Sequence, residues 1–226
     1  EDIYMGRWDS KDYIYFGNGA GQFDRVGKEA GLDTVNQVQL SPNDTNPLRS
    51  ESAPARREAR LNGPAGEEEA GILPYENTMG LGVGDFYDDG FPDIVIGTGD
   101  PGFAGADIFL CNLGQRRFER CTDQFIAPDS DHIMTRGHGA VFADINYDGF
   151  TDFFLNLGGH PPLDFAQKTD SRETNKLFVR QTEATANAAW LTLSGTNSNR
   201  AAIGARVRYG EGDQARYHYL RSTQGF

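Results

Sequence analysis

The sequence predicts an all-β fold, and three observations favour it. Ten short apolar runs are rich in aromatic and β-branched residues and end at Gly, Asn, Asp or Pro. Long helical periodicity is absent. Turn formers are abundant, with 28 glycines and 10 prolines among 226 residues. The hydrophobic content of 38% and the aromatic content of 12% are typical of a globular protein that buries a core.

Each expected strand is one of these runs, because its residues favour a pleated, partly buried conformation over a helix. Their lengths match the short strands of all-β proteins. In chain order, we expect strands within residues 2–6, 13–18, 93–99, 108–112, 141–144, 152–159, 176–180, 190–195, 203–210 and 215–220.

Three segments repeat one pattern: an aspartate, an apolar strand, a loop and a second apolar strand. They start at Asp2, Asp93 and Asp152. The last two lie about 60 residues apart, a spacing that suits a four-stranded propeller blade with its loops. The first interval is about 30 residues longer, and we assign the surplus to a polar surface insertion at 41–71. A partner-binding or substrate-covering loop is the alternative for that segment.

The clearest motif is the acidic loop ADINYDGFTD, which has the pattern D-x-N-x-D-G-x-x-D. Ca²⁺ prefers six to eight oxygen ligands at a flexible site, and alternate positions of a tight loop can supply them. Gly149 at position 6 permits the sharp turn. We predict calcium ligands from the side chains of Asp144, Asn146, Asp148 and Asp152 and from the backbone carbonyl of Phe150.

This loop differs from an EF-hand, because position 12 is Leu155 rather than an acidic residue and the loop leads into a strand. The alternative is a solvated Asp/Gly turn between two strands. Two arguments favour the metal site. Crowded carboxylates repel each other without a cation, and a second acidic loop occurs in the same register.

The second loop, DFYDDGFPD, is less regular. Tyr87 occupies position 3, and Asp88 has moved to position 4, where its side chain should point outward. This loop therefore binds metal more weakly, uses water at position 3 or stays vacant. Its candidate ligands are Asp85, Asp89, Phe91 (backbone carbonyl) and Asp93, and Asp2 matches position 9 of a third loop.

Both loops resemble the FG-GAP/VCBS-type β-propeller repeat. Residues 188–209, AAWLTLSGTNSNRAAIGARVRY, resemble the ASPIC/UnbV domain through the run from Ser198 to Val207. Together they resemble the cartilage acidic protein family. The resemblance implies calcium-binding propeller blades over 1–182 and a truncated ASPIC/UnbV domain over 183–226. It also implies a secreted or periplasmic protein, and a fragment or a ring completed by another chain.

The charge and the hydropathy of the sequence argue against two classes of protein. The net charge of −12 disfavours nucleic acid, whose phosphates need a basic surface. The sequence contains no apolar run of about 18 residues, the length that would predict a membrane span. We expect a non-enzymatic adhesion or interaction module that binds protein or glycan and that self-associates or is completed by missing blades. The alternative is a cyclase- or lyase-type enzyme at the propeller rim, with His138 as acid or base and 41–71 as a lid.

Three other features are interpreted structurally. Cys111 and Cys121 could form a disulfide if a hairpin register allows it, but we favour two reduced, half-buried thiols. His138 and His160 lack the spacing of a zinc site, so we assign them to the blade or rim. The glycine-rich stretch at 80–85 precedes acidic residues, which argues against phosphate binding.

Overall fold

The computed structural model describes residues 2–7, 12–26, 30–31, 77–100, 103–122, 134–158, 173–182, 187–212 and 215–222. The segment 41–71, expected as a surface insertion, lies outside them, and so does His160. Among the described residues, no helix combines the length and apolarity needed to cross a membrane.

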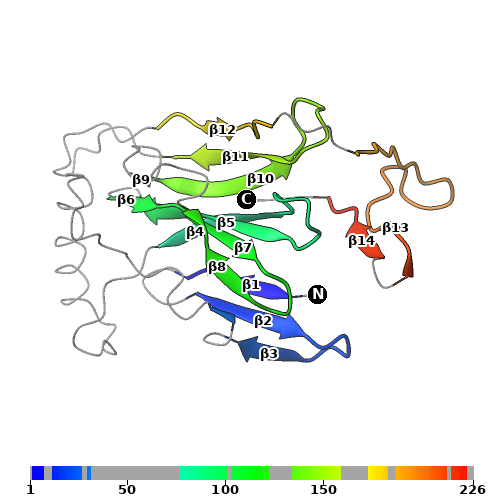
Figure 1. Ribbon diagram of the computed structural model, residues 1–226, viewed down its shortest axis with the longest axis horizontal. Coiled ribbons are helices and arrows are strands. Elements are labelled where there is room, and N and C mark those ends of the chain that lie inside the picture. The colour runs from blue at the N-terminus through cyan, green and yellow to red at the C-terminus, as the bar shows by residue number, and fades with distance from the viewer. Residues whose placement is uncertain are drawn as a thin grey trace.

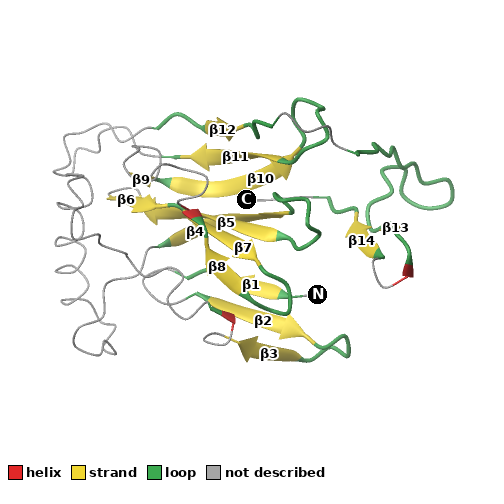
Figure 2. Cartoon of the chain, in the orientation of Figure 1, coloured by secondary structure: helices red, strands yellow, loops and turns green. Residues whose placement is uncertain are grey.

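The regular elements are antiparallel β-strands, which confirms the all-β prediction (Figure 2). They lie in three neighbouring sheets and a separate hairpin (Figure 1). In chain order the strands are β1 Ile3–Met5, β2 Tyr13–Gly17, β3 Phe23–Val26, β4 Thr78–Gly84, β5 Asp93–Asp100, β6 Phe103–Ala106, β7 Ile108–Asn112, β8 Phe118–Arg120, β9 Met134–Thr135, β10 Gly137–Ala143, β11 Asp152–Leu157, β12 Lys176–Phe178, β13 Arg206–Tyr209 and β14 Arg216–Tyr219.

Each sheet follows the chain as a meander. The N-terminal sheet has the order β1-β2-β3, and the third sheet has the order β10-β11-β12. The central sheet pairs β4 with β5, β5 with β7 and β7 with β8, while β6 and β9 extend it beside the end of β5. The strands β13 and β14 form a hairpin of their own, called the tail hairpin below. Figure 1 shows the three sheets side by side, from β12 to β3.

The central sheet is apolar on both faces because a neighbouring sheet covers each face. Ile94 and Ile96 of β5 pack with Ile14 of the N-terminal sheet. Val95, between them, points the other way and packs with Phe153 of the third sheet. Successive side chains of a strand alternate between faces, so a strand buried on both faces reads as a continuous apolar run.

Alternate glycines let β4 approach β10 closely. A Cβ on Gly82 would lie 2.5 Å from the carbonyl oxygen of Ala140, and one on Gly84 would lie 2.4 Å from Cγ of Phe142. Gly80 faces β10 backbone in the same way. The stretch that reads as a glycine-rich loop is therefore a strand. Glycine has low strand propensity, so sequence analysis missed β4; close packing between sheets explains its composition.

Buried carboxylates link strands that lie far apart in the sequence. Asp12, directly before β2, accepts a hydrogen bond from the Thr78 hydroxyl at the start of β4, at 2.5 Å. Asp107, directly before β7, accepts one from the hydroxyl of Thr135 in β9, at 2.6 Å, and this second contact lies within the central sheet. The two aspartates are 4% and 0% exposed. We call these two contacts the Asp–Thr links.

The carboxylates of the Asp–Thr links also bind their own sheet. The amides of Arg7 and Thr98 donate to Asp12 and Asp107, at 2.7 and 3.1 Å. In the third sheet Asn175, directly before β12, replaces the aspartate. Its Oδ1 accepts from the amide of Leu157 at 2.8 Å. The three sheets therefore share this arrangement, and the third has an uncharged version of it.

Two expectations are wrong. Residues 190–195 form no strand, and Trp190 and Leu191 are 58% and 68% exposed, so no sheet buries this apolar run. Cys111 and Cys121 form a disulfide rather than two free thiols. The β7–β8 hairpin places both cysteines in the same buried cluster with Cα atoms 5.9 Å apart, within the range that a disulfide needs.

Burial raises the pKa of Asp107 to about 7, although hydrogen bonds from Thr135 and Thr98 oppose the shift. Lys176 lowers this pKa and Glu173 raises it. Between about pH 4 and 7 the folded chain retains a proton that the unfolded chain has lost. The contribution of Asp107 to the free energy of unfolding is therefore largest at low pH. It falls as the pH rises to about 7 and is constant at higher pH.

Asp107→Asn should remove this dependence, because Asn175 shows that an amide fits the equivalent position. The free energy of unfolding of the variant, relative to that of the unchanged chain, should rise from pH 4.5 to pH 8. The rise should be on the order of 4 kcal/mol at most. Urea denaturation at both pH values measures this gain, with Asp24→Asn on exposed β3 as control. An equal stability difference at both pH values would contradict the assignment.

Candidate metal centre

The two acidic loops occupy equivalent places in neighbouring sheets. Residues 85–92 connect β4 to β5, and residues 144–151 connect β10 to β11. The strand residues at each loop's base, Gly84 with Asp93 and Ala143 with Asp152, are register partners. Both loops lie at the same end of their sheets, on the side of the tail hairpin (Figure 1). The chain therefore builds the same connection twice.

In loop 144–152 the polar side chains converge on the turn. The carboxylate of Asp144 accepts the amides of Asp148 and Gly149, at 3.1 and 3.0 Å. Asn146 donates to the Asp148 carboxylate at 2.8 Å and accepts the Asp148 amide. The amide of Phe150 donates to Asp148 at 2.9 Å. Positions 1, 3 and 5 thus face one another through a shared network.

Loop 85–93 has the same network at positions 1 and 5. Asp85 accepts the amides of Asp89 and Gly90, at 3.1 and 2.7 Å, and Asp89 accepts the amide of Phe91 at 2.8 Å. Position 4 adopts a left-handed backbone in both loops, with φ of 57° at Asp88 and 61° at Tyr147. Position 6 is a glycine with positive φ in both, as the turn requires.

The aspartate at position 9 joins the loop to the sheet. Asp93 accepts the amides of Phe86 in its loop and Asn112 at the end of β7, both at 2.9 Å. Asp152 accepts the amides of Ile145 and Arg180, both at 3.0 Å. These two aspartates are 5% and 0% exposed.

The same bond occurs at the first sheet. Asp2 accepts the amide of Gly17, at the end of β2, at 3.0 Å. In all three sheets, the position 9 aspartate therefore holds the end of a neighbouring strand. These contacts place the aspartates in matching positions, but the hydrogen bonds satisfy protein amides rather than a metal.

The two loops differ in how their charge is balanced. Burial raises the pKa of Asp85, Asp88 and Asp93, and for Asp88 the guanidinium of Arg180 opposes the rise. Asp88, out of phase for a metal ligand, forms an ion pair with Arg180 at 2.6 Å. Tyr87 occupies position 3 without supplying a carboxylate or amide oxygen. The donor set of loop 85–93 is therefore poor.

Loop 144–152 has the better donor set. Its carboxylate and amide oxygens, with the Phe150 carbonyl, are the hard ligands that suit Ca²⁺ rather than zinc. The described residues contain no group of three or more His, Cys, Asp or Glu side chains arranged to coordinate a metal ion. A cation would have to draw Asp144 and Asp148 toward a common centre, using the lone pairs that their amide contacts leave.

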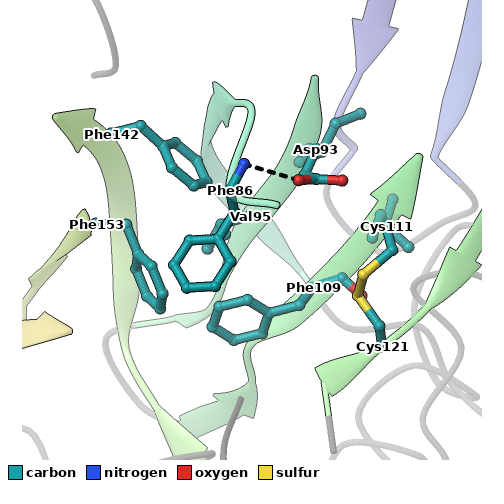
Figure 3. A pocket seen from close by; sticks show the side chains of 10 residues that line it. Phe86, Asp93, Val95, Phe109, Cys111, Cys121, Phe142 and Phe153 are labelled. Carbon is teal, nitrogen blue, oxygen red and sulfur yellow. Dashed lines mark hydrogen bonds between the residues drawn. A yellow bond between two sulfur atoms is a disulfide. The ribbon is translucent and has the colours of Figure 1, made fainter. Parts of the chain in front are cut away.

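Within the described residues, the features considered for catalysis do not form a site; His160 and segment 41–71 lie outside that part of the chain. His138 donates a hydrogen bond through Nδ1 to the carbonyl oxygen of Arg136, 2.9 Å away, and packs against Gly158. A cavity between the central and third sheets has a volume of about 10 Å³ and is lined by aromatic residues, Asp93 and the disulfide (Figure 3). It is about one water molecule in size, too small for a substrate, and His138 does not line it.

Sequence analysis missed several residues that organise the loops. Asn112, Arg180 and Arg216 contact them from distant parts of the chain. The repeat could have identified the first two, because each lies five residues after the Asp107 or Asn175 that precedes its strand. No local signal indicates Arg216.

A scan with protein-family models and a search of curated proteins both returned no match to the chain.

Asp152→Ala should destabilise the chain even when a chelator removes all divalent ions, because two amides lose their buried acceptor. We expect a loss of about 2–4 kcal/mol in the free energy of unfolding. The control is Asp148→Ala in the same loop, whose side chain is exposed and which should have a small effect in chelator. Equal losses for the two variants in urea denaturation would refute the structural role of position 9.

Proposed function

We propose that the chain is a calcium-binding extracellular β-propeller protein that serves as an adhesion or protein- and glycan-interaction module. The observation that carries the proposal is the paired geometry of the two acidic loops. They have matching backbone conformations and hydrogen bonds at equivalent places in neighbouring sheets. When bound, Ca²⁺ would neutralise loop 144–152 and stiffen the connection between β10 and β11.

The propeller interpretation rests on how the sheets repeat. The central sheet contains the four-stranded meander β4-β5-β7-β8, and the sheets on either side supply three strands each. Both faces of the central sheet are covered by a neighbour. Face-to-face packing of successive four-stranded meanders is how propeller blades are arranged. The tail hairpin falls within residues 183–226, which the resemblance assigns to an ASPIC/UnbV domain.

The disulfide supports the proposed location. Cys111 and Cys121 are both bonded and buried, at 5% and 3% exposure. Disulfides persist in oxidising environments such as the cell exterior and the periplasm, and they are rare in the cytosol. We therefore propose a secreted or periplasmic protein.

The interaction surface is proposed near loop 144–152. Tyr147, at its tip, is 74% exposed, and its ring lies 6.4 Å from that of Trp190, measured between centroids. Leu191 follows, at 68% exposure. Exposed aromatic side chains offer a large contact area at low entropic cost, which suits binding to a protein or to the apolar face of a sugar ring.

Millimolar Ca²⁺ should raise the melting temperature over that in chelator. A ligand at 100 times its Kd adds about 2.7 kcal/mol, which corresponds to roughly 5–10 °C for a chain of this size. Asp148→Ala should remove most of the shift, while Asp24→Ala on exposed β3 should keep it. Identical melting curves with chelator and with Ca²⁺ for the unchanged chain would refute calcium binding.

The outer faces of the first and third sheets suggest association. Ile3 and Met5 of β1 are 44% and 46% exposed, whereas Ile94 and Ile96, which follow Asp93 in the same register, are 5% and 0% exposed. On the third sheet Leu177 is 49% exposed. We propose that these faces are covered by self-association or by further blades of the same kind.

Sedimentation of this chain should therefore show concentration-dependent association at micromolar concentrations. Met5→Lys with Leu177→Lys should shift it toward the monomer, because both changes place charge on an apolar outer face. Val83→Lys is the control, since Val83 is 55% exposed but belongs to the central sheet. A strictly monomeric unchanged chain, or equal shifts for both variants, would contradict the proposal.

A further inference from the structure

Loop 85–92 is contacted by arginines from two distant segments. Nη1 of Arg180, after β12, donates to Oδ2 of Asp88 at 2.6 Å and to the carbonyl of Phe86 at 2.7 Å. Nη2 of Arg216, the first residue of β14, donates to the carbonyl of Asp89 at 2.8 Å. Two cations of the chain itself therefore lie at this acidic turn.

Arg180 connects the two acidic loops. Its guanidinium lies 5.8 Å from the ring centroid of Phe86 in one loop and 4.6 Å from that of Phe150 in the other. Its backbone amide donates to Asp152. The Arg180 and Asp88 side chains are 24% and 41% exposed, so water only partly screens their ion pair.

Arg216 packs directly on the turn glycine. Its Nη1 lies 0.3 Å from the point where a Cβ on Gly90 would be. Gly90 therefore serves two purposes: it allows the positive φ of 83° and leaves room for the guanidinium. This contact attaches the tail hairpin to the central sheet.

The sequence difference between the loops fits this arrangement. At position 4, the Asp88 carboxylate forms an ion pair with Arg180 at 2.6 Å. Position 3, which supplies Asn146 in the other loop, is Tyr87. Loop 85–92 therefore lacks the amide donor of position 3 and has instead a position 4 carboxylate that pairs with an arginine of the chain.

We propose that loop 85–92 is a docking loop that Arg180 and Arg216 hold in place of a metal ion. It attaches the end of β12 and the tail hairpin to the central sheet and takes no Ca²⁺. Calcium binding is then confined to loop 144–152, a consequence that rests on the proposed function.

The first test counts bound ions by calorimetric titration of the chain with Ca²⁺. We expect one ion per chain, unchanged in Asp89→Ala and lost in Asp148→Ala. Two ions in the unchanged chain, or loss of an ion in Asp89→Ala, would overturn the inference. No binding at all would refute the proposed calcium site and leave the docking role to the second test.

The second test is done in chelator and measures the arginine contacts directly. In a double-mutant cycle, Arg180→Met and Asp88→Asn should show a coupling of roughly two- to fivefold in the unfolding equilibrium constant. Arg216→Met should speed hydrogen exchange at the β14 amides. Arg208→Met on β13 is the matched control, as its side chain is exposed.

Additive effects of Arg180→Met and Asp88→Asn, or β14 exchange in Arg216→Met that equals that in Arg208→Met, would overturn the docking role. Both readouts are independent of calcium. Failure of the arginine contacts is therefore distinguishable from failure of calcium binding.

Discussion

A carboxylate at the junction of loop and strand is the constraint on which the rest of the arrangement depends. Asp93 and Asp152 each accept one amide from their own loop and one from the neighbouring strand. Because the carboxylate is buried, losing either contact would leave polar groups without partners in the core. This geometry fixes where the acidic loop begins and keeps positions 1 and 5 close together, whether or not a cation is present.

A second set of contacts sets the sheets against one another. The Asp12–Thr78 link joins the N-terminal sheet to the central sheet, and the Asp107–Thr135 link holds β7 to β9, which leads into β10; both lie at the end remote from the acidic loops. The glycines of β4 allow its backbone to approach β10. The apolar faces of β5 then fill the space on both sides. The loops extend from the opposite end of these packed sheets, where loop 85–92 contacts the tail hairpin through Arg216 and loop 144–152 retains the oxygen donors.

Local pattern was enough to predict the strands with continuous apolar runs, such as β5, β7 and β11, and the register of the two acidic loops. It failed where tertiary packing decides. The strand β4 is rich in glycine because it packs closely on β10, and residues 190–195 are apolar yet join no sheet. The disulfide depended on hairpin register, and the role of Arg216 depended on a contact across 127 positions of the chain. Neither the disulfide nor the role of Arg216 could be predicted from neighbouring residues in the sequence.

The most direct test of the account is anomalous X-ray scattering from crystals soaked with Tb³⁺ in place of Ca²⁺. We expect a single peak at ligand distance, about 2.3–2.6 Å, from oxygens of Asp144, Asn146 and Asp148. At loop 85–92 we expect density for the Arg180 and Arg216 side chains and no peak. A peak enclosed by Asp85 and Asp89, or no peak at loop 144–152, would contradict the account.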